Sequence, residues 1–223
     1  MPSRSPEYRL LKQRMRQLKS HFLDFKFDAT AALPPRRIDR VHAFRAFAHA
    51  ELEAYIEDRV SAVIKAAVAE WNSKGRTTPV LTTMIAAVLT RWRDQETDGV
   101  SGQAPPSIPS ISWADGGMAA LIPMCEKVVL DIIKGNNGVR RRDLRKLLLP
   151  VGIPLSRLDD IWLNNLDTYG ASRGEVVHRS LYAITSIPNP TDEWTTASLL
   201  VSDALVLDRL TLVLESGRYI SSI

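Results

Sequence analysis

The sequence predicts an all-α fold, an up-and-down bundle of helices. Apolar residues recur at intervals of three and four positions through most of the 223 residues, which is the spacing of one face of an α-helix. Runs of β-branched residues are short and alternate poorly with polar ones, so no segment is predicted to be a strand. Prolines, glycines and small polar residues lie where the periodic segments begin and end, as helix boundaries require.

Three helices are predicted in the first half of the chain. Residues 8–27 have an apolar face with basic residues between its members, which indicates an amphipathic helix with a positive outer face. After the break at residues 33–35, a long helix is expected over about residues 38–71, ended by Gly75. A third helix is expected over residues 78–92 or beyond, because proline suits the first turn of a helix.

The second half opens with a segment that lacks helical periodicity. Residues 97–117 are rich in Gly, Pro and Ser, and we expect a long surface loop inside a single domain. A helix is then expected over residues 118–134, and Pro123 bends it or delays its start. A short basic helix over 139–149 and a helix from about Arg157, capped by Ser156, follow it. The last element is an apolar helix over 192–215 that stops at Gly217.

The composition is that of one compact domain over residues 1–223, with 45% hydrophobic and 24% charged residues. The net charge of +4 and the pI near 9.3 permit an anionic partner without requiring one. The sequence begins without the apolar core of a signal peptide, and no apolar run reaches the roughly 20 residues that span a bilayer. A cytoplasmic protein without a membrane partner is therefore expected.

The side chains that usually bind metals are sparse. The single cysteine, Cys125, excludes an internal disulfide and a cysteine-rich zinc site, and it fits a reducing compartment. His21, His42 and His49 have no carboxylate or cysteine cluster at metal-ligand spacing. Glycine-rich phosphate loops and nucleophile elbows are absent from the sequence as well. We therefore predict no metal and no cofactor.

The most informative motif is Arg-x4-His at Arg173 and His178, flanked by Gly170 and Gly174. A guanidinium can hold a phosphate through a planar fork of donors, and an imidazole exchanges protons near neutral pH. This pair suits metal-free RNA cleavage through the ribose 2′-hydroxyl. Five positions on an ideal helix lie about 140° apart around the axis. The pair therefore needs the long arginine to wrap back, the two glycines to loosen the turn, or the same motif of a second chain beside it.

Spacing alone does not select this motif, because chance should give about one Arg-x(4 to 6)-His match. Five matches occur: Arg14 and Arg16 before His21, Arg36 and Arg37 before His42, and Arg173 before His178. The first four lie in polar, arginine-rich stretches typical of solvated helix faces. The fifth interrupts an apolar segment, where a charged residue needs a partner or a cleft.

Two segments of the chain carry a family resemblance. Residues 41–60 form an early helix with an alanine–glutamate–aromatic core. Residues 138–180 contain a leucine–proline–glycine connector at residues 149–152, followed in order by the arginine–histidine element. Together they resemble the HEPN superfamily, and specifically its RiboL-PSP-HEPN branch, over about two thirds of the chain. The N-terminal helix and the loop at residues 97–117 are outside the resemblance.

The resemblance implies a HEPN-like helical bundle with extra helices that forms a homodimer, so that two Arg-x(4 to 6)-His motifs face one cleft. It further implies metal-independent endoribonuclease activity in defence, in a toxin system with a cognate antitoxin, or in RNA processing. By motif match, Arg173 and His178 become the catalytic candidates. Many members have a polar residue directly after the arginine, whereas this chain has Gly174, and Ser172 or Glu175 is the candidate substitute.

Other candidates have a functional and a structural interpretation. The resemblance makes Glu53 a supporting residue of the site, whereas helical spacing makes it an ordinary partner of His49 or Glu57. The motif pair itself has the alternative of structural hydrogen bonding to Asp167 or Glu175. The densest basic patch is either an RNA-tracking surface or a solvated helix face, and it consists of Arg140, Arg141, Arg142, Arg145 and Lys146.

The resemblance implies one of two classes of function. The first is an endoribonuclease that leaves a 2′,3′-cyclic phosphate and does not cut DNA. The second is a non-catalytic HEPN module that binds RNA or a partner protein, and the glycine after Arg173 favours it.

Overall fold

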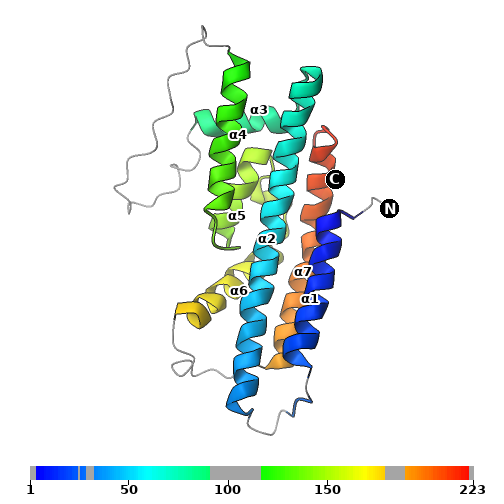
Figure 1. Ribbon diagram of the computed structural model, residues 1–223, viewed down its shortest axis with the longest axis vertical. Coiled ribbons are helices and arrows are strands. Elements are labelled where there is room, and N and C mark those ends of the chain that lie inside the picture. Colours follow the sequence, from blue (N-terminus) through cyan, green and yellow to red (C-terminus); the bar gives the residue numbers. More distant parts are fainter. Residues whose placement is uncertain (1–3, 25, 29–32, 91–116, 179–188, 221–223) are drawn as a thin grey trace. The chain divides into compact units, whose positions relative to one another are not determined.

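Figure 1 shows the computed structural model of the protein, which describes residues 4–24, 26–28, 33–90, 117–178 and 189–220. Within these ranges the chain forms seven α-helices, two short 3₁₀ helices and no strand. The all-α class predicted from the sequence is therefore confirmed. Residues 97–116 of the predicted loop and the side chains of residues 173–178 lie outside the described part.

The helices follow the periodic segments of the sequence, and several begin with a proline in the first turn. Their bounds are α1 Pro6–Leu23, α2 Pro35–Lys74, α3 Pro79–Leu89, α4 Met118–Lys134, α5 Arg141–Leu148, η3 Leu149–Val151, η4 Leu155–Arg157, α6 Asp160–His178 and α7 Pro190–Glu215.

Side-chain caps and left-handed glycines fix the helix ends. The Ser5 hydroxyl accepts the Tyr8 N–H at 3.0 Å at the start of α1, and the Thr78 hydroxyl accepts the Leu81 N–H at 3.2 Å at the start of α3. Gly75 follows α2 with φ 65°, and Gly217 follows α7 with φ 72°. Glycine adopts this conformation without the Cβ penalty of other residues, so both predicted stops are confirmed.

Three predicted boundaries are wrong. The α2 helix begins at Pro35 rather than near Ile38. Proline can occupy the first turn of a helix as well as interrupt one, because the N–H that it lacks has no partner in the first turn. The α1 helix ends at Leu23, so residues 24–27 are not its continuation. The α3 helix ends at Leu89 rather than at residue 92. The bounds predicted for α4, residues 118–134, are confirmed at Met118–Lys134, and Pro123 lies inside the helix without delaying its start.

The predicted cap of α6 is also wrong. Ser156 lies in η4, and the helix begins at Asp160 rather than Arg157. Asp159 is the residue that caps it, because its carboxylate accepts the Ile161 and Trp162 N–H groups at 2.6 and 3.1 Å. A carboxylate at this position also matches the positive end of the helix dipole.

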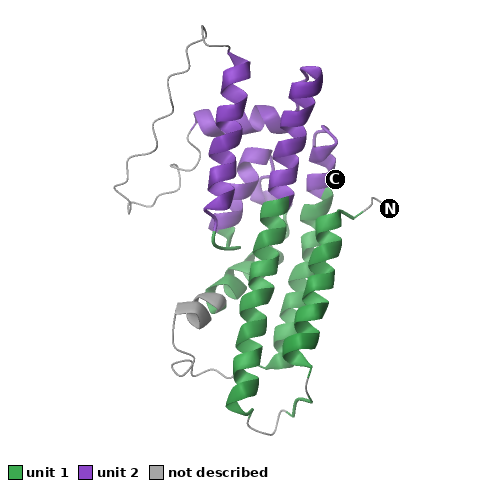
Figure 2. Ribbon diagram, viewed as in Figure 1, with its two compact units in different colours: residues 1–58, 137–141, 158–209 green, residues 59–136, 142–157, 210–223 purple. Residues whose placement is uncertain are grey.

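The described chain divides into two compact units, shown in Figure 2, and the prediction of a single domain is not tested by this division. Unit 1 comprises residues 1–58, 137–141 and 158–209, and thus α1, α6, the first part of α2 and most of α7. Its helices are joined by buried polar contacts as well as apolar packing. The Tyr8 hydroxyl donates to the Val201 carbonyl at 3.0 Å, and the Trp162 indole N–H donates to the Leu200 carbonyl at 3.0 Å.

Unit 2 comprises residues 59–136, 142–157 and 210–223. In this unit α3 packs against α4 and η3. Gly152 follows η3 with φ 84°, and a Cβ there would lie 3.3 Å from the Thr83 hydroxyl oxygen, so the connector favours glycine for both conformation and space. The buried Cys125 belongs to this unit, and burial raises the pKa of its thiol to about 11. Such a thiol stays protonated and does not serve as a nucleophile near neutral pH.

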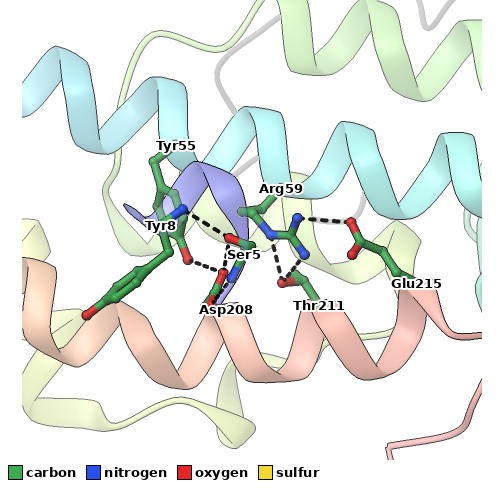
Figure 3. A network of polar contacts seen from close by, with 7 residues as sticks. All are labelled: Ser5, Tyr8, Tyr55, Arg59, Asp208, Thr211 and Glu215. Carbon is green, nitrogen blue, oxygen red and sulfur yellow. Dashed lines mark hydrogen bonds and ion pairs between the residues drawn. The ribbon is translucent and has the colours of Figure 1, made fainter. Parts of the chain in front are cut away.

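Each unit contains a buried charged side chain held by a polar network, and Figure 3 shows both networks. In unit 1 the fully buried Asp208 accepts the Ser5 backbone N–H at 3.0 Å and also the Ser5 hydroxyl. In unit 2 the buried Arg59 guanidinium donates to the Thr211 hydroxyl and pairs with Glu215 at 2.9 Å. A buried charge without such partners would cost several kcal/mol, so these networks hold α7 in register within each unit.

His42 corrects one sequence-based expectation, because only 2% of it is exposed, although it follows an arginine-rich stretch. Its Nδ1 atom has no hydrogen-bond partner among the described residues. Val41, Phe44 and Ala48 are buried around it on α2, and this apolar side of the helix outweighs the neighbouring arginines. Burial, and then the Arg45 charge, lower the pKa of His42, while Glu193 and Asp39 oppose the shift.

This burial predicts acid sensitivity of the fold. A histidine whose pKa is lower in the folded than in the unfolded state takes up its proton on unfolding, so stability falls as pH drops below about 6.5. We expect the unfolding free energy of the parent to fall more steeply than that of His42→Gln between pH 7.5 and 5.5. Urea titrations at several pH values measure the two slopes, and equal slopes would contradict the assignment to His42.

Candidate functional site

The two predicted catalytic residues lie in the last two turns of α6, which extends through Arg173 to His178. Their side chains, with that of Glu175, are outside the described part of the chain, so their proposed meeting stays a prediction. The helix is continuous through Gly170, and the expectation that this glycine loosens the turn is wrong. Neighbours three and four positions apart share one side of a helix, so position 173 is on the side of Tyr169 and Gly170.

Tyr169, one turn before Arg173, anchors α6 to α2. Only 3% of Tyr169 is exposed, and its hydroxyl donates to the Arg45 carbonyl at 3.3 Å. Its ring is stacked with the His49 imidazole, with centroids 6.2 Å apart and planes 19° from parallel. Burial raises the pKa of Tyr169, so its hydroxyl stays protonated and remains a donor.

Gly170 allows two polar side chains to approach the α6 backbone. A Cβ at this position would lie 3.0 Å from Cγ of Arg140 and 3.7 Å from Nε2 of His49. The first distance is shorter than an ordinary carbon–carbon contact, so any larger residue would displace the Arg140 side chain. The glycine therefore serves close packing within a regular helix, in addition to marking the motif.

His49 and Glu53 lie one turn apart on α2 and form an ion pair when the imidazole is protonated. The His49 Nδ1 atom is 3.6 Å from a Glu53 carboxylate oxygen, and 2% and 13% of the two side chains are exposed. The helical partner predicted for Glu53 is thus present, but it is a buried histidine and not a surface one. The His49 imidazole and the Arg140 side chain therefore lie at the turn that precedes Arg173, and the Glu53 carboxylate lies beside the imidazole.

Ser172, predicted to replace the missing polar residue, makes a local contact. Its hydroxyl donates to the Tyr169 carbonyl at 2.8 Å, one turn back in the same helix. This bond satisfies the hydroxyl within α6, as is common for serine in helices. Among the described residues, the hydrogen bond of the Ser172 side chain is thus made within its own helix.

The predicted basic patch is divided between the two units. Arg140 and Arg141 belong to unit 1, and the remaining three residues belong to unit 2. Arg141 is held by acceptors near the start of α6, with its guanidinium 3.1 Å from Asp160 and 2.9 Å from Asn164, and its backbone N–H 2.6 Å from Asp167. Asp167 thus pairs with Arg141.

Sequence reasoning did not find the contact between Arg140 and Gly170 or the ring stack of His49 on Tyr169. A signal for His49 exists, because it follows Val41 and His42 by eight and seven positions on the side of α2 that carries apolar residues. No comparable signal exists for Arg140, because its contact joins segments about 30 residues apart.

Metal-ligating groups of three or more His, Cys, Asp or Glu side chains are not found among the described residues. Nor does any helix within those residues have the length and apolarity to cross a membrane. The chain matches no protein-family profile, no curated protein and no solved structure.

Proposed function

We propose that the protein is a metal-independent endoribonuclease of the HEPN type. In this proposal Arg173 binds the scissile phosphate and stabilises the charge that develops on it. His178 takes the proton of the ribose 2′-hydroxyl or gives one to the leaving 5′-oxygen. The 2′-oxygen forms a bond to phosphorus as the bond to the 5′-oxygen breaks, and the products are a 2′,3′-cyclic phosphate and a 5′-hydroxyl.

One structural observation supports the proposal. The motif follows, on a continuous helix, a turn at which Tyr169 and Gly170 contact His49 and Arg140. Glu53 lies beside this histidine. A helix that is packed just before the proposed catalytic residues favours a positioned acid–base group, because misplacement by about 1 Å can cost a hundredfold in rate.

The proposal includes a homodimer, because a single chain supplies one motif and the resemblance implies a cleft shared by two. A role in defence, toxin–antitoxin systems or RNA processing belongs to it on the same ground. The second candidate is a non-catalytic HEPN module that binds RNA or a protein. Gly174 directly after Arg173 favours this candidate, since that position lacks the polar side chain that many members have.

The test is RNA cleavage in EDTA, with the two arginines of the motif region compared. A bidentate fork cannot be copied by an ammonium, so Arg173→Lys should lose about 2 kcal/mol or more of transition-state stabilisation, roughly thirtyfold in rate. Arg179→Lys, next to the histidine, should cost little. The readout is the 2′,3′-cyclic phosphate end formed on one RNA substrate.

The outcomes separate the two candidates. Equal losses in both variants would indicate a general basic surface rather than a phosphate clamp. A parent protein that binds RNA but leaves it intact in EDTA would favour the non-catalytic module.

A further inference from the structure

One flank of α1, beside its buried side, carries a row of basic side chains. Arg9, Lys12, Arg16 and Lys19 are spaced by three, four and three positions, so they follow one side of the helix over about 15 Å. Arg9, Arg16 and Lys19 are exposed, and Lys12 is half-buried. Tyr8, Leu11, Met15 and Leu18 occupy the buried side of the same helix.

The cations of this row differ from other arginines of unit 1. Arg14 pairs with Glu51 at 3.0 Å, and Arg45 pairs with Glu193. Among the described residues, no carboxylate forms an ion pair with Arg9, Lys12 or Arg16. Unpaired cations in a row attract a partner with regularly spaced negative charges.

Positive charge is concentrated in this part of the sequence. Residues 1–45 contain eleven Lys and Arg against four Asp and Glu, which gives a net charge of +7, whereas the whole chain has +4. The remaining residues are therefore net negative by 3 charges. Such an asymmetry produces a directed field toward anionic partners.

An aromatic groove lies at the C-terminal end of the row. It is lined by Lys19, Leu23, Phe27, Pro190, Thr191 and Trp194 and has a volume of about 130 Å³. The Lys19 ammonium lies 4.5 Å from the centre of the Trp194 ring, and Trp194 itself is half-buried. Cavities of about 150 Å³ accept benzene, so the groove is on the scale of one aromatic ring.

We propose that α1 and this groove bind single-stranded RNA. The phosphates lie along Arg9, Lys12 and Arg16, and one unpaired base enters the groove against Trp194 and Phe27 as the Lys19 ammonium turns from the Trp194 ring to a phosphate. Basic rows that track the backbone, combined with aromatic side chains that stack bases, are how proteins hold single strands. The binding of RNA to α1 does not depend on the proposed nuclease function. The role of this RNA as the substrate rests on that function.

Other anionic partners fit the surface less well. A duplex keeps its bases paired and stacked, so it offers no ring to the groove. A membrane surface would need a wide exposed apolar face on α1 for insertion, whereas Tyr8, Leu11, Met15 and Leu18 are buried in unit 1 and Leu10 is the exposed large apolar residue of this helix. Figure 1 shows α1 beside α7, the helix that carries Trp194, and the hydrogen bond from Tyr8 to Val201 joins the two helices.

The experiment measures binding of the full chain to a fluorescent 12-nucleotide 2′-O-methyl oligouridine, which cannot be cleaved, by anisotropy at several salt concentrations. The test variant is Arg9→Gln/Arg16→Gln/Lys19→Gln. Each phosphate contact contributes about 0.7 to the salt slope for single strands, so three lost contacts should lower it by roughly 2. The affinity should fall at least about tenfold at low salt.

A matched control removes three exposed cations from unit 2 by Lys65→Gln/Lys134→Gln/Arg157→Gln, and it should bind nearly as the parent does. Trp194→Leu should weaken binding at least about fivefold, and Trp194→Phe should retain most of it. Circular dichroism and melting curves check that each variant is folded. If the triple variant is unstable, the comparison of Trp194→Leu with Trp194→Phe still tests the inference.

Three outcomes would overturn the inference: equal weakening in the control, unchanged binding in both α1 and Trp194 variants, or binding by the parent to vesicles of anionic lipid but not to the oligouridine. The nuclease proposal fails separately. A protein that binds the oligouridine through α1 but never cleaves unmodified RNA removes the nuclease proposal alone. A protein that cleaves RNA while its α1 variants bind normally removes this inference alone.

Discussion

His178→Ala should reduce RNA cleavage by at least about a hundredfold while the protein remains folded. A positioned acid or base contributes roughly 10² to 10⁴ in rate, and alanine has no group that exchanges a proton. The measurement is the rate of 2′,3′-cyclic phosphate formation under single-turnover conditions in EDTA. Binding of an uncleavable oligonucleotide should stay within about twofold of the parent, because the histidine acts on the proton and the arginines hold the phosphates.

The matched control is His21→Ala. Arg16 precedes His21 at the same spacing as Arg173 precedes His178, and His21 is exposed at the end of α1. This variant should cleave RNA as the parent does. That result would show that the Arg-x4-His spacing alone does not make a histidine catalytic. His42 is unsuitable as a control because it is buried, and its replacement changes stability. Full activity in His178→Ala, or unfolding of that variant, would make the histidine a structural residue.

The helices could be predicted from the sequence because their apolar faces are long and regular. The α2 helix has buried side chains at Val41, Phe44, Ala48 and Leu52, spaced by three and four, and this spacing alone predicts the element. Its stop at Gly75 and that of α7 at Gly217 follow from one conformational preference of glycine. Local rules therefore suffice for most of the fold.

Positions at which two local rules compete were predicted less well. Ser156 and Asp159 are both good capping residues, and the choice depends on where the 3₁₀ turn ends, which spacing does not reveal. His42 obeys the apolar spacing of α2, but its polarity and its arginine neighbours suggested a solvated face. In that conflict the packing of the helix prevailed.

The candidate site could be predicted only in part, for a physical reason. Arg173 and His178 are visible because they interrupt an apolar segment, which a sequence displays directly. The contacts of Arg140 and His49 with Gly170 join three segments distant in sequence. Nothing local distinguishes a glycine that loosens a helix from one that admits a neighbouring side chain.

The largest effect on stability is expected for Asp208→Asn, at about 2–4 kcal/mol of unfolding free energy. Asp208 is fully buried and accepts the Ser5 N–H at 3.0 Å, the Ser5 hydroxyl, and the Tyr55 hydroxyl at 3.4 Å. An asparagine retains one carbonyl oxygen and turns an N–H₂ group toward one of these donors. Urea denaturation measures the loss. Asp203→Asn on the same helix, where burial already raises the carboxyl pKa, should stay within about 0.5 kcal/mol.

A double-mutant cycle with Ser5→Ala tests whether the loss arises at this contact. The Ser5 hydroxyl bonds both to Asp208 and to the Tyr8 N–H at the first turn of α1, so each single variant should loosen the start of that helix. Both variants break the same hydrogen bond. The double variant should therefore lose less unfolding free energy than the two single variants together, and the difference should be about 1 kcal/mol or more. Hydrogen exchange should show faster opening of α1 in either variant. Strictly additive losses would mean that Asp208 stabilises α7 without holding the N-terminal helix.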